Sequence, residues 1–111
     1  MIAVASLIPN DPDEQRTVLS VLDAHPEVRS FVARASAKAE ELFPGATIRL
    51  DSVQYDEWDP PLHLVVSVPL PWTDYLARRE ALITWVSGQR DLDLDLILPL
   101  PMWTGPLDSR P

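Results

Sequence analysis

Residues 91–100, with the sequence DLDLDLILPL, alternate leucine with other residues over almost their whole length. Side chains on a β-strand point to opposite faces with a period of two, so the alternation predicts a strand with one leucine face. The opposite face begins with Asp91, Asp93 and Asp95. We expect helices to cover the leucine face and the three aspartates to be exposed to solvent.

Three helices are predicted upstream of this strand. Asp11 as N-cap with Pro12 in the first turn predicts a helix that ends before Pro26. Apolar residues at three- and four-residue spacing predict a second helix over 26–43. A third helix is expected to be capped by Thr73 and to end at Ser87 and Gly88.

Two further strands, over residues 46–55 and 62–70, form a predicted hairpin. The chain is therefore expected to be one α+β domain over residues 1–111, in the order ααββαβ, with a three-stranded sheet and helices on one face. The third strand should run parallel to the second and lie beside the first. If residues 2–8 form a strand instead, the alternative is a ferredoxin-like βαββαβ fold. Residues 101–111 are expected to be an irregular tail.

The charge of the chain narrows the classes of partner. Seventeen acids and nine bases give a formal net charge of −8, which opposes binding to nucleic acid or to an anionic membrane. The absence of cysteine excludes disulfides and thiolate metal sites. The apolar N-terminus lacks a basic region and is too short to span a bilayer, so we expect a cytoplasmic protein.

The three aspartates of residues 91–100 have two functional interpretations. A strand-borne Asp-x-Asp could hold the metal ions of a nucleotidyl- or phosphoryl-transfer domain. That interpretation lacks a phosphate-binding loop, because the chain has only three glycines, and neither His25 nor His63 has metal-ligand spacing. We therefore predict no metal, no cofactor and no catalytic residue, and we favour structural roles for both histidines.

A second acidic segment surrounds a tryptophan in the predicted hairpin connection. Trp58 has Asp56, Glu57 and Asp59 as close neighbours, and Trp103 lies in the predicted tail. Tryptophan is enriched at interaction hot spots, and acids steer a basic partner toward such a site. The predicted partner-binding residues are Asp91, Asp93, Asp95, Trp58, Asp56, Glu57, Asp59 and Trp103.

The run Glu41-Leu42-Phe43-Pro44-Gly45-Ala46 leads into a predicted strand, which is followed by a second strand, a Trp-bearing helix and the acidic strand. Over residues 38–100 this pattern resembles small uncharacterised αββαβ proteins of bacteria, some of them antitoxin-like. The resemblance implies a non-catalytic accessory role and carries over no functional residue.

The sequence thus predicts a protein-interaction module that neutralises or regulates a basic protein, which a neighbouring gene could encode. The alternatives are the metal-dependent transfer domain described above and a self-assembling structural protein. In the last case, the third strand would pair edge to edge in a homodimer.

Overall fold

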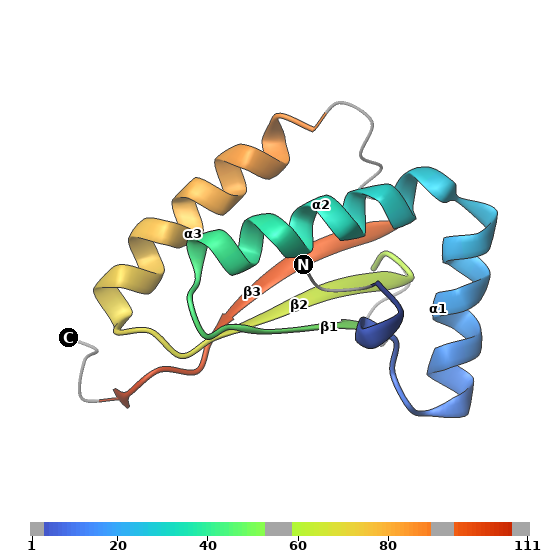
Figure 1. The fold of residues 1–111 in the computed structure, drawn as a ribbon, viewed down its shortest axis with the longest axis horizontal. Coiled ribbons are helices and arrows are strands. Elements are labelled where there is room, and N and C mark those ends of the chain that lie inside the picture. Colours follow the sequence, from blue (N-terminus) through green and yellow to red (C-terminus); the bar gives the residue numbers. More distant parts are fainter. Residues whose placement is uncertain (1–3, 53–58, 90–94, 108–111) are drawn as a thin grey trace.

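The computed structural model describes residues 4–52, 59–89 and 95–107 of the chain. Their order confirms the predicted ααββαβ arrangement of an α+β fold (Figure 1). The elements are η1 (Val4–Leu7), α1 (Pro12–Ala24), α2 (Pro26–Leu42), β1 (Thr47–Asp51), β2 (Leu62–Val68), α3 (Trp72–Ser87) and β3 (Ile97–Trp103).

The first two helices begin where the sequence predicts. The side chain of Asp11 accepts a hydrogen bond from the backbone N–H of Glu14 at 3.0 Å, and Pro12 occupies the first turn of α1. Pro26 likewise stands in the first turn of α2, which buries one apolar stripe that includes Phe31 and Val32. Helix α3 differs from the prediction, because its N-cap is Pro71 rather than Thr73 and no side chain caps it.

Residues 4–7 form a short 3₁₀ helix, η1, which buries Leu7 in the core. The alternative βαββαβ fold required a strand over residues 2–8, so it was wrong. Ala5 and Ser6 have low strand propensity, which favours a helical turn in this segment.

The three strands form one mixed sheet in the order β1-β2-β3. β1 pairs antiparallel with β2, and β3 runs parallel to β2, as predicted. The predicted position of the third strand beside the first was wrong. β2 is the central strand, and residues on both of its faces are buried.

The predicted alternation of side chains between the two faces of β3 is confirmed. The prediction that helices cover the leucine face was wrong. Helices α2 and α3 lie on one side of the sheet (Figure 1), over the face that carries Leu64 and, beside it, Pro99. Leu98 and Leu100 point to the opposite face. Both faces of β3 are apolar. The alternating sequence therefore assigns each residue to a face but does not show which face the helices cover. Ile97, on the helix side, is completely buried.

β3 also begins and ends later than predicted. Asp95 and Leu96 form a turn before the strand, and residues 91–94 lie outside the described part of the chain. The strand continues to Trp103, so the beginning of the predicted tail belongs to the sheet. On the other edge of the sheet, β1 ends at Asp51. In the sequence, the alternation of apolar residues changes phase directly after this position. None of the helices in the described residues is long and apolar enough to cross a bilayer.

Candidate functional site

The structure describes three of the eight residues predicted to bind a partner. These are Asp59, Asp95 and Trp103. The other five lie outside the described residues: Asp56, Glu57, Trp58, Asp91 and Asp93.

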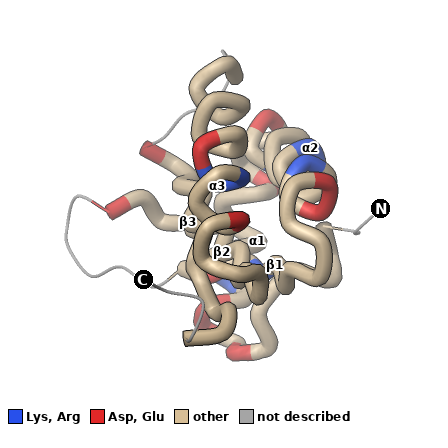
Figure 2. Tube along the Cα trace, turned by 90° about the vertical axis from the view of Figure 1, so that its left-hand side faces the viewer, with Lys and Arg blue, Asp and Glu red and all other residues tan. Residues whose placement is uncertain are grey.

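Asp59 and Asp95 lie at the same end of the sheet. β2 and β3 are parallel, with Leu62 beside Ile97, so the two strands start side by side. Asp59 precedes β2 by three residues and Asp95 precedes β3 by two. We call this end of the sheet, defined by Asp59 and Asp95, the strand-start end. Figure 2 shows acidic segments of the trace that directly adjoin the segments drawn in grey.

The two sequence segments that precede β2 and β3 have a strong excess of negative charge. Residues 56–59 and 90–95 contain Asp or Glu at 56, 57, 59, 91, 93 and 95, and Arg90 is their one base. The described lysine and arginine side chains are engaged within the fold, mostly in exposed ion pairs such as Arg29 with Asp23 and Arg79 with Glu80. These bases therefore make contacts within the chain. The excess of acids in these two segments favours cations and basic side chains as partners.

Trp103 lies far from these acids, at the opposite end of β3. Its indole N–H donates a hydrogen bond to the backbone oxygen of Leu70 at 2.8 Å. Its ring meets Trp72 edge to face, with 5.0 Å between centroids. These contacts hold the end of β3 to the start of α3, and the structure does not bring Trp103 together with Asp59 and Asp95.

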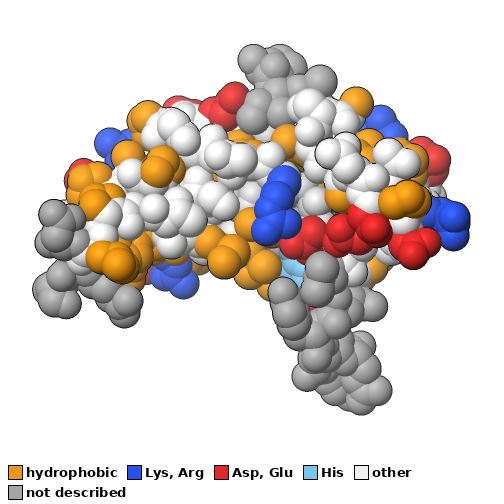
Figure 3. Space-filling view, turned by 90° about the horizontal axis from the view of Figure 1, so that it is seen from below, with side chains coloured by type: hydrophobic (Ala, Val, Ile, Leu, Met, Phe, Trp, Pro, Cys, Tyr) orange, Lys and Arg blue, Asp and Glu red, His pale blue; other side chains and the backbone are white. Residues whose placement is uncertain are grey.

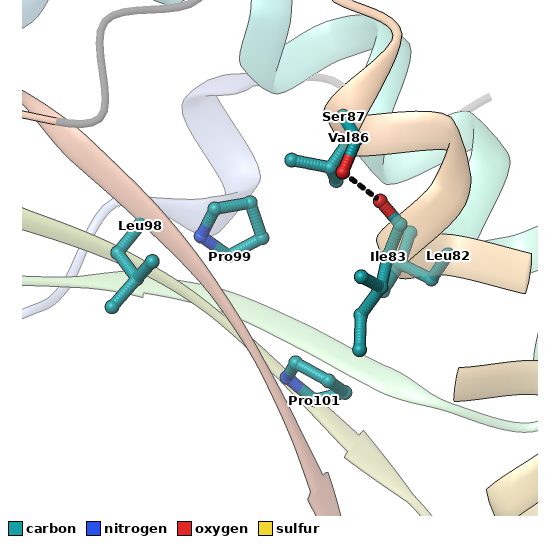
Figure 4. A pocket seen from close by; sticks show the side chains of 7 residues that line it. All are labelled: Leu82, Ile83, Val86, Ser87, Leu98, Pro99 and Pro101. Atoms are coloured by element: carbon teal, nitrogen blue, oxygen red, sulfur yellow. Dashed lines mark hydrogen bonds between the residues drawn. The ribbon is translucent and has the colours of Figure 1, made fainter. Parts of the chain in front are cut away.

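An apolar groove of about 220 Å³ separates the C-terminal half of α3 from β3 (Figure 4). We call it the α3–β3 groove. Pro99 and Pro101 face the helix, and Ile83 and Val86 point toward the strand (Figure 4). Its lining is Leu82, Ile83, Val86, Ser87, Leu98, Pro99 and Pro101. Pro99 of the groove follows Asp95 by four residues, so the groove lies toward the strand-start end of β3.

The groove exists because α3 is held mainly from its other side. The ring of Trp85 stacks on Phe31 of α2, with centroids 6.1 Å apart. Arg34 of α2 donates a hydrogen bond to the side chain of Gln89, just after α3. Near the start of α3, the hydroxyl of Tyr75 donates to the backbone oxygen of Pro101 at 3.1 Å. The helix is thus tied to β3 near its beginning and to α2 near its end.

The outer edge of β3 is deficient in hydrogen-bond donors. Thr104 N–H donates to the oxygen of Val68 at 2.9 Å, so even-numbered positions of this segment direct their backbone groups toward β2. Odd-numbered positions face outward, and Pro99 and Pro101 have no N–H. The outward oxygen of Pro101 already accepts the Tyr75 hydroxyl. This edge is therefore a poor template for an added strand.

A polar cluster lies on the face of the sheet away from α2 and α3. His63 and Asp51 are a cross-strand pair, and Nδ1 of His63 lies 3.1 Å from Oδ1 of Asp51. The other carboxylate oxygen accepts a hydrogen bond from Arg49 at 3.0 Å. The His63 side chain is 5% exposed, which is consistent with the structural role predicted for it. Figure 3 shows this side of the molecule, with acidic side chains in a row on the right-hand half and hydrophobic ones from the left edge toward the centre.

Among the described residues, no group of three His, Asp or Glu side chains could hold a metal ion. Asp95 lies in a turn, so the strand-borne arrangement assumed for the metal-dependent alternative was wrong for this residue. The described lining of the groove contains no titratable side chain, and the Ser87 hydroxyl donates to the Ile83 oxygen at 2.9 Å.

Sequence reasoning did not identify the α3–β3 groove. On α3, the large apolar residues Ile83 and Leu76 are 38% and 40% exposed. The usable signal was the pair Pro99 and Pro101, since prolines in a strand mark an edge.

Comparisons with protein-family models, with curated proteins and with solved structures found no match for the chain. The resemblance to antitoxin-like proteins therefore stays a prediction.

Proposed function

We propose that this chain is a protein-interaction module whose strand-start end binds a basic protein. The observation that carries the proposal is the register of β2 and β3, which puts Asp59 and Asp95 at one end of the sheet. Two acidic segments of the sequence, residues 56–59 and 91–95, lead into these two positions. An antitoxin-like or regulatory role would be one form of such binding.

The adjoining groove supports the same proposal, because charge alone gives steering and little specificity. A protein interface needs an apolar centre with polar residues around it. Ile83 and Pro99 offer such a centre, and Pro99 lies four residues after Asp95 in the sequence. The charged and apolar parts of the surface thus lie where one partner could contact both.

Charge reversal tests the proposal. A labelled Arg- and Lys-rich peptide should bind the wild-type chain, and the double variant Asp59→Lys/Asp95→Lys should weaken binding by roughly tenfold or more at low ionic strength. Glu40→Lys/Glu41→Lys is the matched control, because it also reverses two exposed charges. Glu40 is exposed at the C-terminal end of α2, near the opposite end of the sheet. Equal weakening by both sets of reversals would mean that only net charge matters, which contradicts a site at the strand-start end.

A further inference from the structure

We infer that the α3–β3 groove receives the apolar side chains of an amphipathic, basic helix on the partner protein. The inference rests on the proposed function and specifies the shape of the partner. Four features carry it: the size of the groove, the placement of its walls, the missing donors of the β3 edge, and the acids beside it.

The groove has room for large apolar side chains. An apolar cavity of about 150 Å³ in a protein interior is enough to hold benzene, and this groove measures about 220 Å³. Its walls are the side chains of Ile83 and Val86 on the helix and of Pro99 and Pro101 on the strand. An occupant would therefore gain its affinity from burial of apolar side chains and not from backbone hydrogen bonds.

The edge of β3 argues against an extended occupant. A partner strand needs N–H donors along the edge to which it adds, and Pro99 and Pro101 supply none. A helix satisfies its own backbone hydrogen bonds and presents apolar side chains at three- and four-residue spacing. Seated beside α3, such a helix would fill the groove without help from the edge of the sheet.

The charge of the neighbouring surface selects a basic helix over a second copy of this chain. Asp95 is exposed four residues before Pro99 of the groove, and Glu80 is exposed on α3, where its carboxylate lies 3.7 Å from Arg79. A second copy with a net charge of −8 would bring acids against these acids. Lysine or arginine on the polar face of a partner helix would meet them favourably.

Two synthetic peptides of identical Leu and Lys composition test this inference. Each is about 18 residues long, so that a helix can form. One places leucine at i, i+3, i+4 and i+7, and the other alternates leucine and lysine as a strand would. The wild-type chain should bind the helical pattern roughly tenfold more tightly than the alternating one.

Ile83→Ser should weaken binding of the helical peptide by roughly tenfold, because it removes apolar surface from the groove. Leu76→Ser is the matched control: Leu76 lies on the same helix with similar exposure, 40% against 38%, but does not line the groove. It should change the affinity by less than about twofold. Ile83→Ala provides a second, milder variant in case the serine variant unfolds, and thermal unfolding of each variant checks the fold.

The possible failures are distinguishable. If the alternating peptide binds equally well, or if Ile83→Ser and Leu76→Ser behave alike while reversal of Asp59 and Asp95 still weakens binding, the helix inference is overturned and the proposed function survives. If neither peptide binds the wild-type chain, both are contradicted. A concentration-dependent dimer that Ile83→Ser abolishes would assign the groove to a second copy and overturn the inference.

Discussion

The indole N–H of Trp103 donates to the backbone oxygen of Leu70, and Gly105 passes directly against this hydrogen bond. A Cβ atom at Gly105 would lie 2.0 Å from the Leu70 oxygen and 2.5 Å from the Trp103 nitrogen. The contact fastens the last residue of β3 to the segment that enters α3. Two short segments far apart in the sequence are thus locked together by a position that only glycine can occupy.

Gly105→Ala should therefore lower the free energy of unfolding, by about 1–3 kcal/mol, because the backbone must shift to relieve the overlap. Denaturant unfolding followed by tryptophan fluorescence measures the change. Gly88→Ala is the control, since a Cβ there would meet the Trp85 oxygen at 3.5 Å, an ordinary contact. Its effect should stay within about 1 kcal/mol. Similar losses for both variants would show that the close approach at Gly105 is unimportant.

Ser36 places a polar side chain in the core. Its hydroxyl is buried in α2 and makes no hydrogen bond to any residue that the structure describes. Ser36→Ala should raise the free energy of unfolding, by up to about 1 kcal/mol, because it removes an unsatisfied buried group and improves helix propensity. Ala35→Ser, at a neighbouring buried position, should lower stability by about 1–3 kcal/mol. A clear loss of stability in Ser36→Ala would imply that the hydroxyl has a partner.

The Asp51–His63 pair should contribute measurably to stability because the imidazole is buried. A double-mutant cycle with Asp51→Asn and His63→Gln should give a coupling energy of about 1 kcal/mol. Arg49→Gln should cost less than about 0.5 kcal/mol, since the Arg49 side chain is 55% exposed and its ion pair is screened by solvent. A coupling energy near zero would show that the cross-strand contact does not contribute to the free energy of unfolding.

The prolines of β3 should protect the protein from self-association. Pro99→Thr/Pro101→Thr restores two outward N–H donors to the edge of the sheet, so sedimentation velocity should show oligomers that grow with protein concentration. Pro106→Thr, beyond the end of β3, is the control. If the double variant sediments like the control at every concentration, the edge is protected by something other than its missing donors.

The sequence predicted the order of elements because each has a local signal. Asp11 with Pro12 starts α1, and the apolar spacing of residues 26–43 defines α2. The neighbours of β3 and its covered face could not be predicted in this way, since they depend on which surfaces meet in space. The buried run of β2 did signal a central strand, and a central β2 would have put the third strand in its observed place.

Only part of the candidate site was within reach of sequence reasoning. The acidic segments were visible as composition, but their convergence depends on the register of Leu62 with Ile97. The groove depends on how far α3 stands from β3, a distance set by the contact of Trp85 with Phe31 on the far side of the helix. Neither relationship is encoded in a local pattern.

Mapping of the binding surface by NMR tests the central claim most directly. In a titration with the helical Leu/Lys peptide, the largest backbone amide shifts are expected at Asp59, Asp95 and Ile83. The amides of Glu40 and Leu42, at the opposite end of the sheet, should remain unchanged. Shifts concentrated at Glu40 and Leu42, or spread evenly over the exposed acids of the chain, would contradict a binding site at the strand-start end and the α3–β3 groove.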